Sequence, residues 1–305
     1  MSKLITVFGA TGNQGGSVIE AILRDPTLSK EFKIRAITRD VTKPSAQALA
    51  AKGIEVVAAD MSSADALAPA VEGAHTVFLV TNFWETFSAD VEIAQGKAVT
   101  DAAKAAGVQH LIFSSLLNTT EASAGKLPNI THFDSKAKIE EYIRSTGIPA
   151  TFVLPGLFMT NFFEWLRKDD KGEYTIALPI SPEKGQIPLL DASGDTGKFV
   201  AAAIRHHPET LGKRIYAATD YYTPAQIAAE FSEVIKKPAA AIQVPDDVFK
   251  SFLPAAAAQE LLENMKLLED PGYYAGADLK ESLSLLSEEP ISWKAYAELN
   301  KAKWQ

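Results

Sequence analysis

A glycine-rich segment near the amino terminus is the strongest chemical feature of the sequence. Residues 9–16 read Gly-Ala-Thr-Gly-Asn-Gln-Gly-Gly, so Gly9, Gly12 and Gly15 recur at intervals of three. Between a strand and a helix, glycines permit a tight turn and let a pyrophosphate approach bare backbone amides. The amino terminus of the helix then stabilises the anion. We therefore predict a dinucleotide site. No Gly-Lys-Ser/Thr ending follows, which disfavours a phosphate loop for nucleotide hydrolysis.

Charged residues follow the second predicted strand, where the ribose of a dinucleotide would lie. Arg39 ends this strand, Asp40 is its neighbour, and Lys43 is close by. Two cations at this position favour a 2′-phosphate, and therefore NADP(H). The alternative is that both cations are solvated surface residues, and Asp40 keeps NAD(H) open as the cofactor.

The third and fourth predicted strands also end in residues suited to a cofactor. Asp60 is placed to accept a hydrogen bond from an adenine amino group, with Met61 against the ring, or else to flank the N-cap of the next helix. Thr81, Asn82 and Phe83 end the fourth strand. In an open α/β sheet the carboxyl ends of the strands line the ligand crevice, so we expect these residues to contact cofactor.

The elements that must position these residues alternate regularly. Near-continuous apolar runs, typical of strands buried on both faces, predict a parallel sheet. The predicted strands are 4–9, 33–39, 55–60, 76–81, 110–116 and 150–156, and helices are expected at 91–106 and 133–146. This order predicts an α/β protein with a doubly wound, Rossmann-type parallel sheet.

After about residue 156 the sequence is interrupted by proline and glycine, which predicts a smaller α+β lobe. We expect a dinucleotide-binding domain over residues 1–156 and the smaller lobe over 157–305, with late elements of this second part returning to the core. A strand is predicted at 214–219, and helices at 197–205, 223–235, 255–268 and 292–302. The alanine runs 239–241 and 255–258 are interpreted as helix or loop.

Composition limits the function classes. The 305 residues include 30 Lys+Arg and 38 Asp+Glu, a net charge of −8, and no cysteine. Thiol chemistry and disulfides are therefore excluded, and the cytoplasm is the expected location, with the nucleus as an alternative. The scattered cations predict no direct nucleic-acid binding, and no apolar run is long enough to predict a membrane span. The histidines, including the adjacent pair His206-His207, predict no metal site.

Several longer motifs carry a resemblance to a known family. They are residues 9–16, Thr38-Arg39, Thr81-Asn82-Phe83-Trp84-Glu85, Gln95-Gly96-Lys97, and His132-Phe133-Asp134-Ser135-Lys136 before Glu140-Glu141-Tyr142. With these, nearly the whole chain resembles the NmrA-like family, an atypical branch of the short-chain dehydrogenase/reductase superfamily. The motifs are closest to those of the family's human redox-sensor member.

The resemblance implies binding of NADP(H) or NAD(H) and a set of contact residues. These are Gly9, Ala10, Thr11, Gly12, Asn13, Gln14, Gly15, Arg39, Lys43, Asp60, Met61, Thr81, Asn82, Phe83 and Lys136. The segment 155–161 implies two more, Phe158 and Asn161, although its spacing is one residue longer than in the human protein.

One residue of the reductase machinery is absent. Catalytic short-chain reductases place a tyrosine four residues before the lysine, and here His132 precedes Lys136. His132 could transfer protons, or it could cap or pack the helix. Ser114-Ser115 ends the fifth predicted strand, where catalytic relatives keep a serine that binds the substrate carbonyl, or it is simply a strand terminus. The resemblance also includes reductases that work with a lysine and no tyrosine, so Lys136 stays a candidate.

Two functions follow from these residues. The first is an NADP(H)-binding redox sensor that signals dinucleotide state through a protein partner, such as a transcription regulator. The alternative is an NADPH-dependent oxidoreductase acting on a small carbonyl, quinone or enone, with Ser115, Lys136 and His132 as the candidate catalytic residues. Catalytic activity and homodimer formation stay open.

Overall fold

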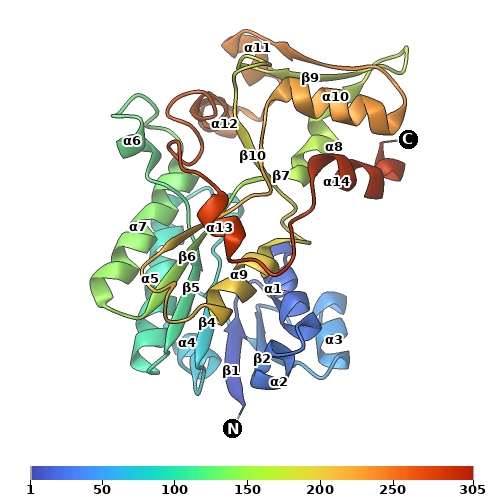
Figure 1. Cartoon of the computed structure of the whole chain (residues 1–305). Helices are drawn as coiled ribbons and strands as arrows, with labels where there is room; N and C mark the ends of the chain where they lie inside the picture. Colours follow the sequence, from blue (N-terminus) through green and yellow to red (C-terminus); the bar gives the residue numbers. More distant parts are fainter. Residues whose placement is uncertain (1, 305) are drawn as a thin grey trace.

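A seven-stranded parallel sheet forms the centre of the protein. The computed structural model describes residues 2–304 (Figure 1). The sheet has the order β11-β6-β5-β4-β1-β2-β3. Its strands are β1 (Lys3–Val7), β2 (Phe32–Thr38), β3 (Glu55–Ala58), β4 (Thr76–Leu79), β5 (His110–Ser114), β6 (Ala150–Pro155) and β11 (Arg214–Ala217). Each of the seven strands overlaps a run that the sequence predicted, so the Rossmann-type doubly wound prediction is confirmed.

The strand order changes direction at β1, and this fixes where a ligand crevice can form. Strand β1 pairs with β2 on one side, where Val7 lies beside Ala36, and with β4 on the other, where Val7 lies beside Phe78. The chain first winds outward through β2 and β3 and then returns to the other side of β1. The connections that follow β1 and β4 run to opposite faces of the sheet. A crevice is therefore left between the carboxyl ends of these two strands.

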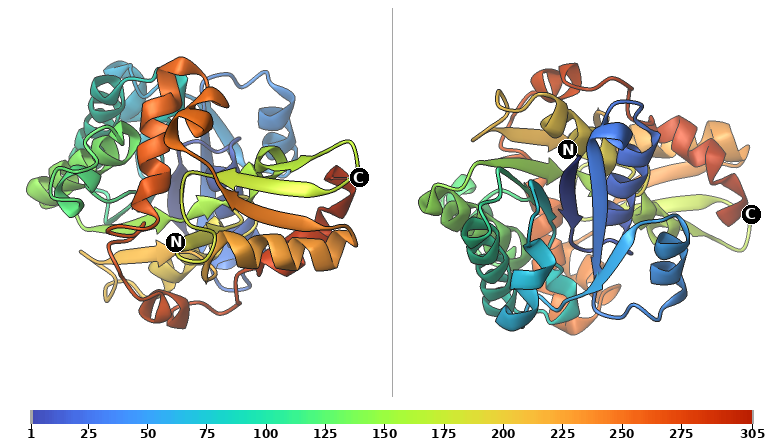
Figure 2. Two further views of the ribbon diagram at one scale, coloured as in Figure 1. Left: turned by 90° about the horizontal axis from the view of Figure 1, so that it is seen from above. Right: turned by 90° about the horizontal axis from the view of Figure 1, so that it is seen from below.

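Helices cover both faces of the sheet (Figure 2). One face packs against α1 (Asn13–Arg24) and α9 (Thr196–Arg205), and the other against α4 (Ala64–Val71), α5 (Ala89–Ala105) and α7 (Thr131–Thr146). The shorter helices of this part are α2 (Leu28–Glu31), α3 (Pro44–Ala51), α6 (Thr119–Ala122) and the 3-10 turn η1 (Phe83–Glu85).

Two glycines allow neighbouring helices to lie unusually close. A Cβ atom at Gly197 would clash with the backbone of Ser17, so α9 can cross α1 only with glycine there. A Cβ at Gly96 would lie 2.6 Å from the Ile139 side chain, between α5 and α7. Gly96 belongs to one of the motifs that carry the family resemblance, and its role is to bring α5 against α7.

The second half of the chain contributes to the sheet as well as to the smaller lobe. Helix α9 packs on α1, and β11 pairs with β6 as the edge strand. Helix α13 (Lys280–Ser284) then lies on β11, where the Ser282 hydroxyl accepts a hydrogen bond of 2.9 Å from the amide of Tyr216.

The smaller lobe lies over the carboxyl ends of the parallel strands, at the top of Figure 1. It has two three-stranded sheets, ordered β12-β10-β7 and β13-β9-β8. Its elements are β7 (Leu157–Phe158), η2 (Met159–Asn161), α8 (Phe162–Trp165), β8 (Leu166–Lys168), β9 (Tyr174–Leu178), β10 (Ile187–Leu190), β12 (Tyr221–Tyr222), α10 (Pro224–Ile235), β13 (Ala239–Gln243), α11 (Asp246–Ser251), α12 (Ala255–Leu267), α14 (Trp293–Leu299) and η3 (Lys301–Lys303).

One expectation for this lobe was wrong. The alanine run 239–241, interpreted as helix or loop, forms strand β13, which pairs in parallel with β9 over five residues. Alanine favours helices, but pairing with β9 and packing against α10 override that preference. The second alanine run begins α12, as expected. Among residues 2–304, no helix is both long and apolar enough to cross a membrane.

Candidate functional site

The glycine segment forms the turn that its spacing predicts. Gly9 has a φ of +64°, and a Cβ there would lie 2.7 Å from the side chain of Val80. A Cβ at Gly15 would clash with the carbonyl of Gly9, so the first turn of α1 rests directly on the glycine turn. Gly12 is the N-cap of α1 and supplies no capping side chain, and the first turn holds no acid. The first amides of the helix are therefore available to an anion.

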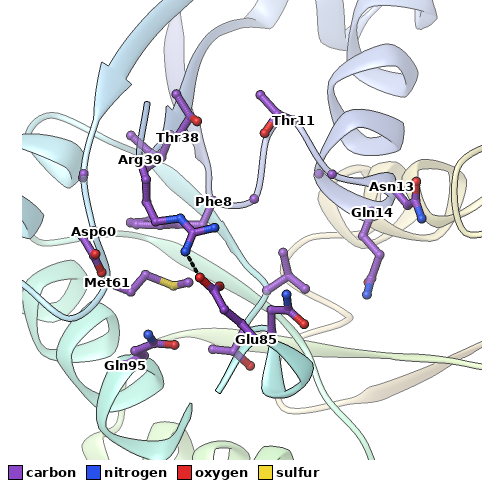
Figure 3. Close-up of a pocket in the computed structure, with 18 of the residues that line it drawn as sticks. Phe8, Thr11, Asn13, Gln14, Thr38, Arg39, Asp60, Met61, Glu85 and Gln95 are labelled. Carbon is purple, nitrogen blue, oxygen red and sulfur yellow. Dashed lines mark hydrogen bonds and ion pairs between the residues drawn. The ribbon is translucent and has the colours of Figure 1, made fainter. Parts of the chain in front are cut away.

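A cavity of about 400 Å³ opens at this turn, between the carboxyl ends of β1, β2, β3 and β4. Figure 3 shows the lining side chains. Thirteen of the expected contact residues line it: Gly9, Thr11, Gly12, Asn13, Gln14, Gly15, Arg39, Lys43, Asp60, Met61, Thr81, Asn82 and Phe158. Four others, Ala10, Phe83, Lys136 and Asn161, are not in the lining.

The cavity also has lining residues to which the sequence analysis gave no role. Glu85 and Gln95 are the clearest, and both belong to the motifs that carry the family resemblance. Glu85 forms an ion pair with Arg39, and Gln95 donates a hydrogen bond of 3.0 Å to the Ser62 hydroxyl. Their place in those motifs could have indicated that they belong to the site. Their distance along the sequence from the glycine turn gives no such indication.

The carboxylates of the cavity are mostly bound to their own loops. Asp40 accepts hydrogen bonds from the amide and hydroxyl of Thr42, which lower the pKa of its carboxyl group, and the Lys43 charge lowers it further. Asp60 accepts a bond of 2.8 Å from the amide of Ser62 and so closes the turn before α4. This bond engages Asp60 Oδ1 beside Ser63, the N-cap of α4, so flanking the N-cap is compatible with a contact from Oδ2 to a ligand.

The two serines at the end of β5 point in opposite directions, because successive residues of a strand alternate between its faces. Ser114 donates a hydrogen bond of 2.8 Å to the Gln14 side chain, beside the glycine turn. Ser115 is buried and donates a bond of 2.6 Å to Glu140, on the α7 side. The structure therefore does not bring Ser115 to the cavity as expected; the serine on the cofactor side is Ser114.

Lys136 is held inside the protein by the end of β4 and by α5. Its ammonium forms an ion pair with Glu92 and donates bonds of 3.1 and 2.9 Å to the carbonyl and hydroxyl of Thr81. Glu92 is buried and also accepts bonds from Thr81 and Ser135. Because Thr81 lines the cavity, Lys136 positions the cavity wall at this residue rather than projecting into the open space.

His132 is paired with a carboxylate from the smaller lobe. Its amide and its Nδ1 both contact Glu260 Oε1 of α12, at 2.8 and 2.6 Å. Burial raises the pKa of Glu260, but the bonds from His132 outweigh it and leave the pKa below its usual value. An ionised carboxylate can only accept, so Nδ1 carries a proton and Nε2 is the remaining functional atom. The imidazole lies 4.8 Å from the Trp84 ring, centroid to centroid.

Three of the other histidines lie at the opposite end of the strands from the glycine turn. His75, His110 and His207 line a separate cavity of about 250 Å³ at the amino ends of the strands. Within the part of the chain that the structure describes, no group of His, Asp or Glu side chains is arranged to hold a metal ion.

These features define the protein as a Rossmann-type α/β protein with a glycine-turn crevice. The chain belongs to the NmrA-like family, whose model matches residues 1–304. An NmrA-like family domain-containing oxidoreductase from Penicillium ochrochloron, ptmS, is 34% identical over 253 residues, which cover 77% of this chain and 74% of that one. A similarly named protein from Aspergillus flavus, lnaB, is 32% identical over 76% of this chain and 73% of its own.

The fold is also similar to solved structures. NmrA, a negative transcriptional regulator crystallised in complex with NADP, superposes with a TM-score of 0.82 at 25% identity, covering 97% of this chain and 94% of that one. An NADPH-dependent quinone oxidoreductase from Escherichia coli, QOR2, gives a TM-score of 0.77 at 24% identity, covering 97% and 99%.

Proposed function

We propose that this protein binds NADP(H) in the glycine-turn cavity, with NAD(H) as the weaker ligand, and that it signals dinucleotide state to a protein partner. One observation carries the regulatory part of the proposal. Two of the three candidate catalytic side chains are bound to buried carboxylates away from the open space: Ser115 to Glu140 and Lys136 to Glu92. Most residues expected to contact a dinucleotide thus line an open cavity, while Ser115 and Lys136 are engaged by other side chains of the protein.

The residues present fit a dinucleotide. The glycine turn and the first amides of α1 would hold the pyrophosphate, and Arg39 with Lys43 would hold a 2′-phosphate. Asp60 and Met61 would contact the adenine. The crystallisation of NmrA both with NAD and with NADP supports this assignment, as does the description of NmrA as a transcriptional regulator.

The test is calorimetric titration of the wild-type protein and Arg39→Ala with NADP⁺, NADPH, NAD⁺ and NADH. We expect Arg39→Ala to weaken NADP⁺ binding about tenfold, because charge-assisted bonds to the phosphate are lost, and to leave NAD⁺ binding nearly unchanged. If wild-type protein bound none of the four dinucleotides, the proposal would be wrong. Unchanged NADP⁺ affinity in the variant would remove Arg39 from the phosphate site.

The signalling part has its own measurement. A ligand can shift a conformational equilibrium only if it binds the two conformations with different affinity. A signalling role therefore predicts that NADP(H) alters the hydrogen-exchange protection of backbone amides on the surface around the cavity. Protection that is the same in both conditions would contradict a regulatory role.

The second candidate function is an NADPH-dependent reductase of a carbonyl, quinone or enone. The His132–Glu260 pair favours it, since a carboxylate on Nδ1 orients an imidazole for proton transfer at Nε2. The relatives named oxidoreductases support it as well. A nicotinamide cofactor would supply the hydride when bound, and His132 as imidazolium would donate the proton. NADPH consumption over a panel of such substrates decides the matter: turnover that falls in His132→Gln supports the reductase, and none above background excludes it.

A further inference from the structure

Glu85 faces Arg39 across the mouth of the cavity (Figure 3). Arg39 follows β2, and Glu85 ends η1, just after β4. Strand β1 lies between β2 and β4, so the ion pair crosses above the carboxyl end of β1. The pair therefore lies over the crevice in which a dinucleotide would bind.

The pair differs from the other charged groups of the cavity. Three carboxylates line it, but Asp40 is bound to Thr42 and Asp60 to Ser62. Among the lining residues that the structure describes, Glu85 is the carboxylate that forms an ion pair with a cation. Both partners are open to solvent, with 60% of the Arg39 side chain and 41% of the Glu85 side chain exposed. Solvent screens an ion pair this exposed and makes it weak, so a ligand can break it.

We propose that Glu85 is a specificity-determining residue, which competes with the 2′-phosphate of NADP(H) for Arg39 and so reduces the preference for NADP(H) over NAD(H). The inference rests on the proposed dinucleotide binding. A 2′-phosphate must displace Glu85 from the guanidinium or share it with a nearby negative charge, and either costs affinity. NAD(H) has no phosphate at this position and leaves the pair intact.

Calorimetry with Glu85→Gln tests the competition. We expect the variant to bind NADP⁺ about three- to fivefold more tightly than wild type, because the competing charge is gone, and to bind NAD⁺ within about twofold of wild type. A gain for both dinucleotides, or for neither, would overturn the proposal. It would leave the proposed function standing, because that fails only if the wild-type protein binds no dinucleotide.

Two further variants show whether the effect acts through Arg39. In an Arg39→Ala background, Glu85→Gln should give no gain in NADP⁺ affinity, since no guanidinium remains to be freed. Asp40→Asn removes the same charge from the same cavity without touching the pair, so its gain should be smaller than that of Glu85→Gln. If Asp40→Asn gave the same gain in NADP⁺ affinity as Glu85→Gln, the gain would come from removing any negative charge near the cavity. That result would disprove the competition for Arg39. Asp65→Asn, on the exposed surface of α4, is the control for net charge.

The displacement of Glu85 has an optical readout. Glu85 shares the three-residue turn η1 with Trp84, an exposed side chain whose ring lies tilted against that of His132. NADP⁺ and NAD⁺ carry the same chromophores, so a difference between the Trp84 fluorescence changes that they cause reports the 2′-phosphate alone. We expect a larger change with NADP⁺, lost in Trp84→Phe. Equal changes with both dinucleotides would show that Glu85 stays in place, contrary to the proposal.

Discussion

Two cation–glutamate pairs lie beside the same cavity, and they differ in almost every physical respect. Arg39–Glu85 crosses the mouth, with both side chains about half exposed. Lys136–Glu92 lies at the end of β4, where only 10% of the lysine side chain and 1% of the glutamate side chain are exposed. The buried pair is also hydrogen-bonded by Thr81 and Ser135, whereas the exposed pair is open to solvent. The Lys136–Glu92 pair thus holds the cavity wall at Thr81 in place, whereas Arg39 and Glu85 at the mouth can exchange each other for a ligand.

Breaking the buried pair should have the largest effect. Glu92→Gln leaves the Lys136 ammonium without its carboxylate in a buried site, and we expect it to lower the free energy of unfolding by about 3–5 kcal/mol. Urea denaturation of wild type and variant measures this. The double variant Glu92→Gln/Lys136→Met should recover part of the loss, because the unpaired charge is gone. A loss below about 1 kcal/mol in the single variant would mean that water reaches the pair.

The pH dependence of stability gives a comparison that involves neither pair. It depends on His110, which lies at the opposite end of the strands. Burial, reinforced by the neighbouring His207 and His75, lowers the pKa of His110 to about 3. In the unfolded chain His110 therefore binds a proton near pH 6.5, whereas in the folded protein it stays neutral until about pH 3. The free energy of unfolding falls as the pH drops from about 6.5 toward 3. At pH 5 this amounts to about 2 kcal/mol.

The matched variant for this effect is His110→Gln, which removes the titrating group. Between pH 7 and pH 5 the stability of wild type should fall by about 2 kcal/mol more than that of the variant, as measured by urea denaturation at each pH. Parallel losses in the two proteins would show that His110 is not the group responsible.

The close approach of α5 and α7 can be tested next. Gly96→Ala places a methyl group 2.6 Å from Ile139, and it should cost about 1–2 kcal/mol, since overpacking outweighs the helix preference of alanine. Thermal unfolding would report the loss. Combining it with Ile139→Ala should cost less than the sum of the two single changes, because the clash is relieved. A stabilised Gly96→Ala protein would show that the helices can separate without affecting the buried pair.

The smallest effect on stability should come from the exposed pair. Arg39→Ala and Glu85→Ala should each change the free energy of unfolding by less than about 0.5 kcal/mol, because solvent screens the charges. Denaturation curves that overlay wild type are the expected result. A loss above about 1 kcal/mol in either variant would place this pair in the same class as Lys136–Glu92 and remove the contrast.

The central sheet and much of the cavity could be predicted from the sequence, and the partners of the catalytic candidates could not. Apolar runs and a glycine turn are local patterns, so the strands, Gly12 and Arg39 were all identified. The carboxylates that hold Ser115, Lys136 and His132 lie 25, 44 and 128 residues away. Nothing in the spacing of Glu140, Glu92 or Glu260 indicates such pairings, because they depend on how helices and the smaller lobe pack.

Strand β13 shows the same limit from another side. Its alanines have a local preference for helix, and only β9, more than sixty residues earlier, makes them a strand. The choice between Ser114 and Ser115 could not be predicted for a related reason, since the exact end of a strand decides which of two adjacent serines faces the glycine turn.

Strand β11 completes the sheet from a point some sixty residues after β6. A fragment ending at residue 156 would lack β11 and so expose the hydrogen-bonding edge of β6. Exposed strand edges of this kind pair with other chains and promote aggregation. During synthesis on the ribosome, the nucleotide-binding half therefore cannot finish folding until the chain has been made well past residue 217. Premature termination between these points would yield insoluble material instead of a smaller working protein.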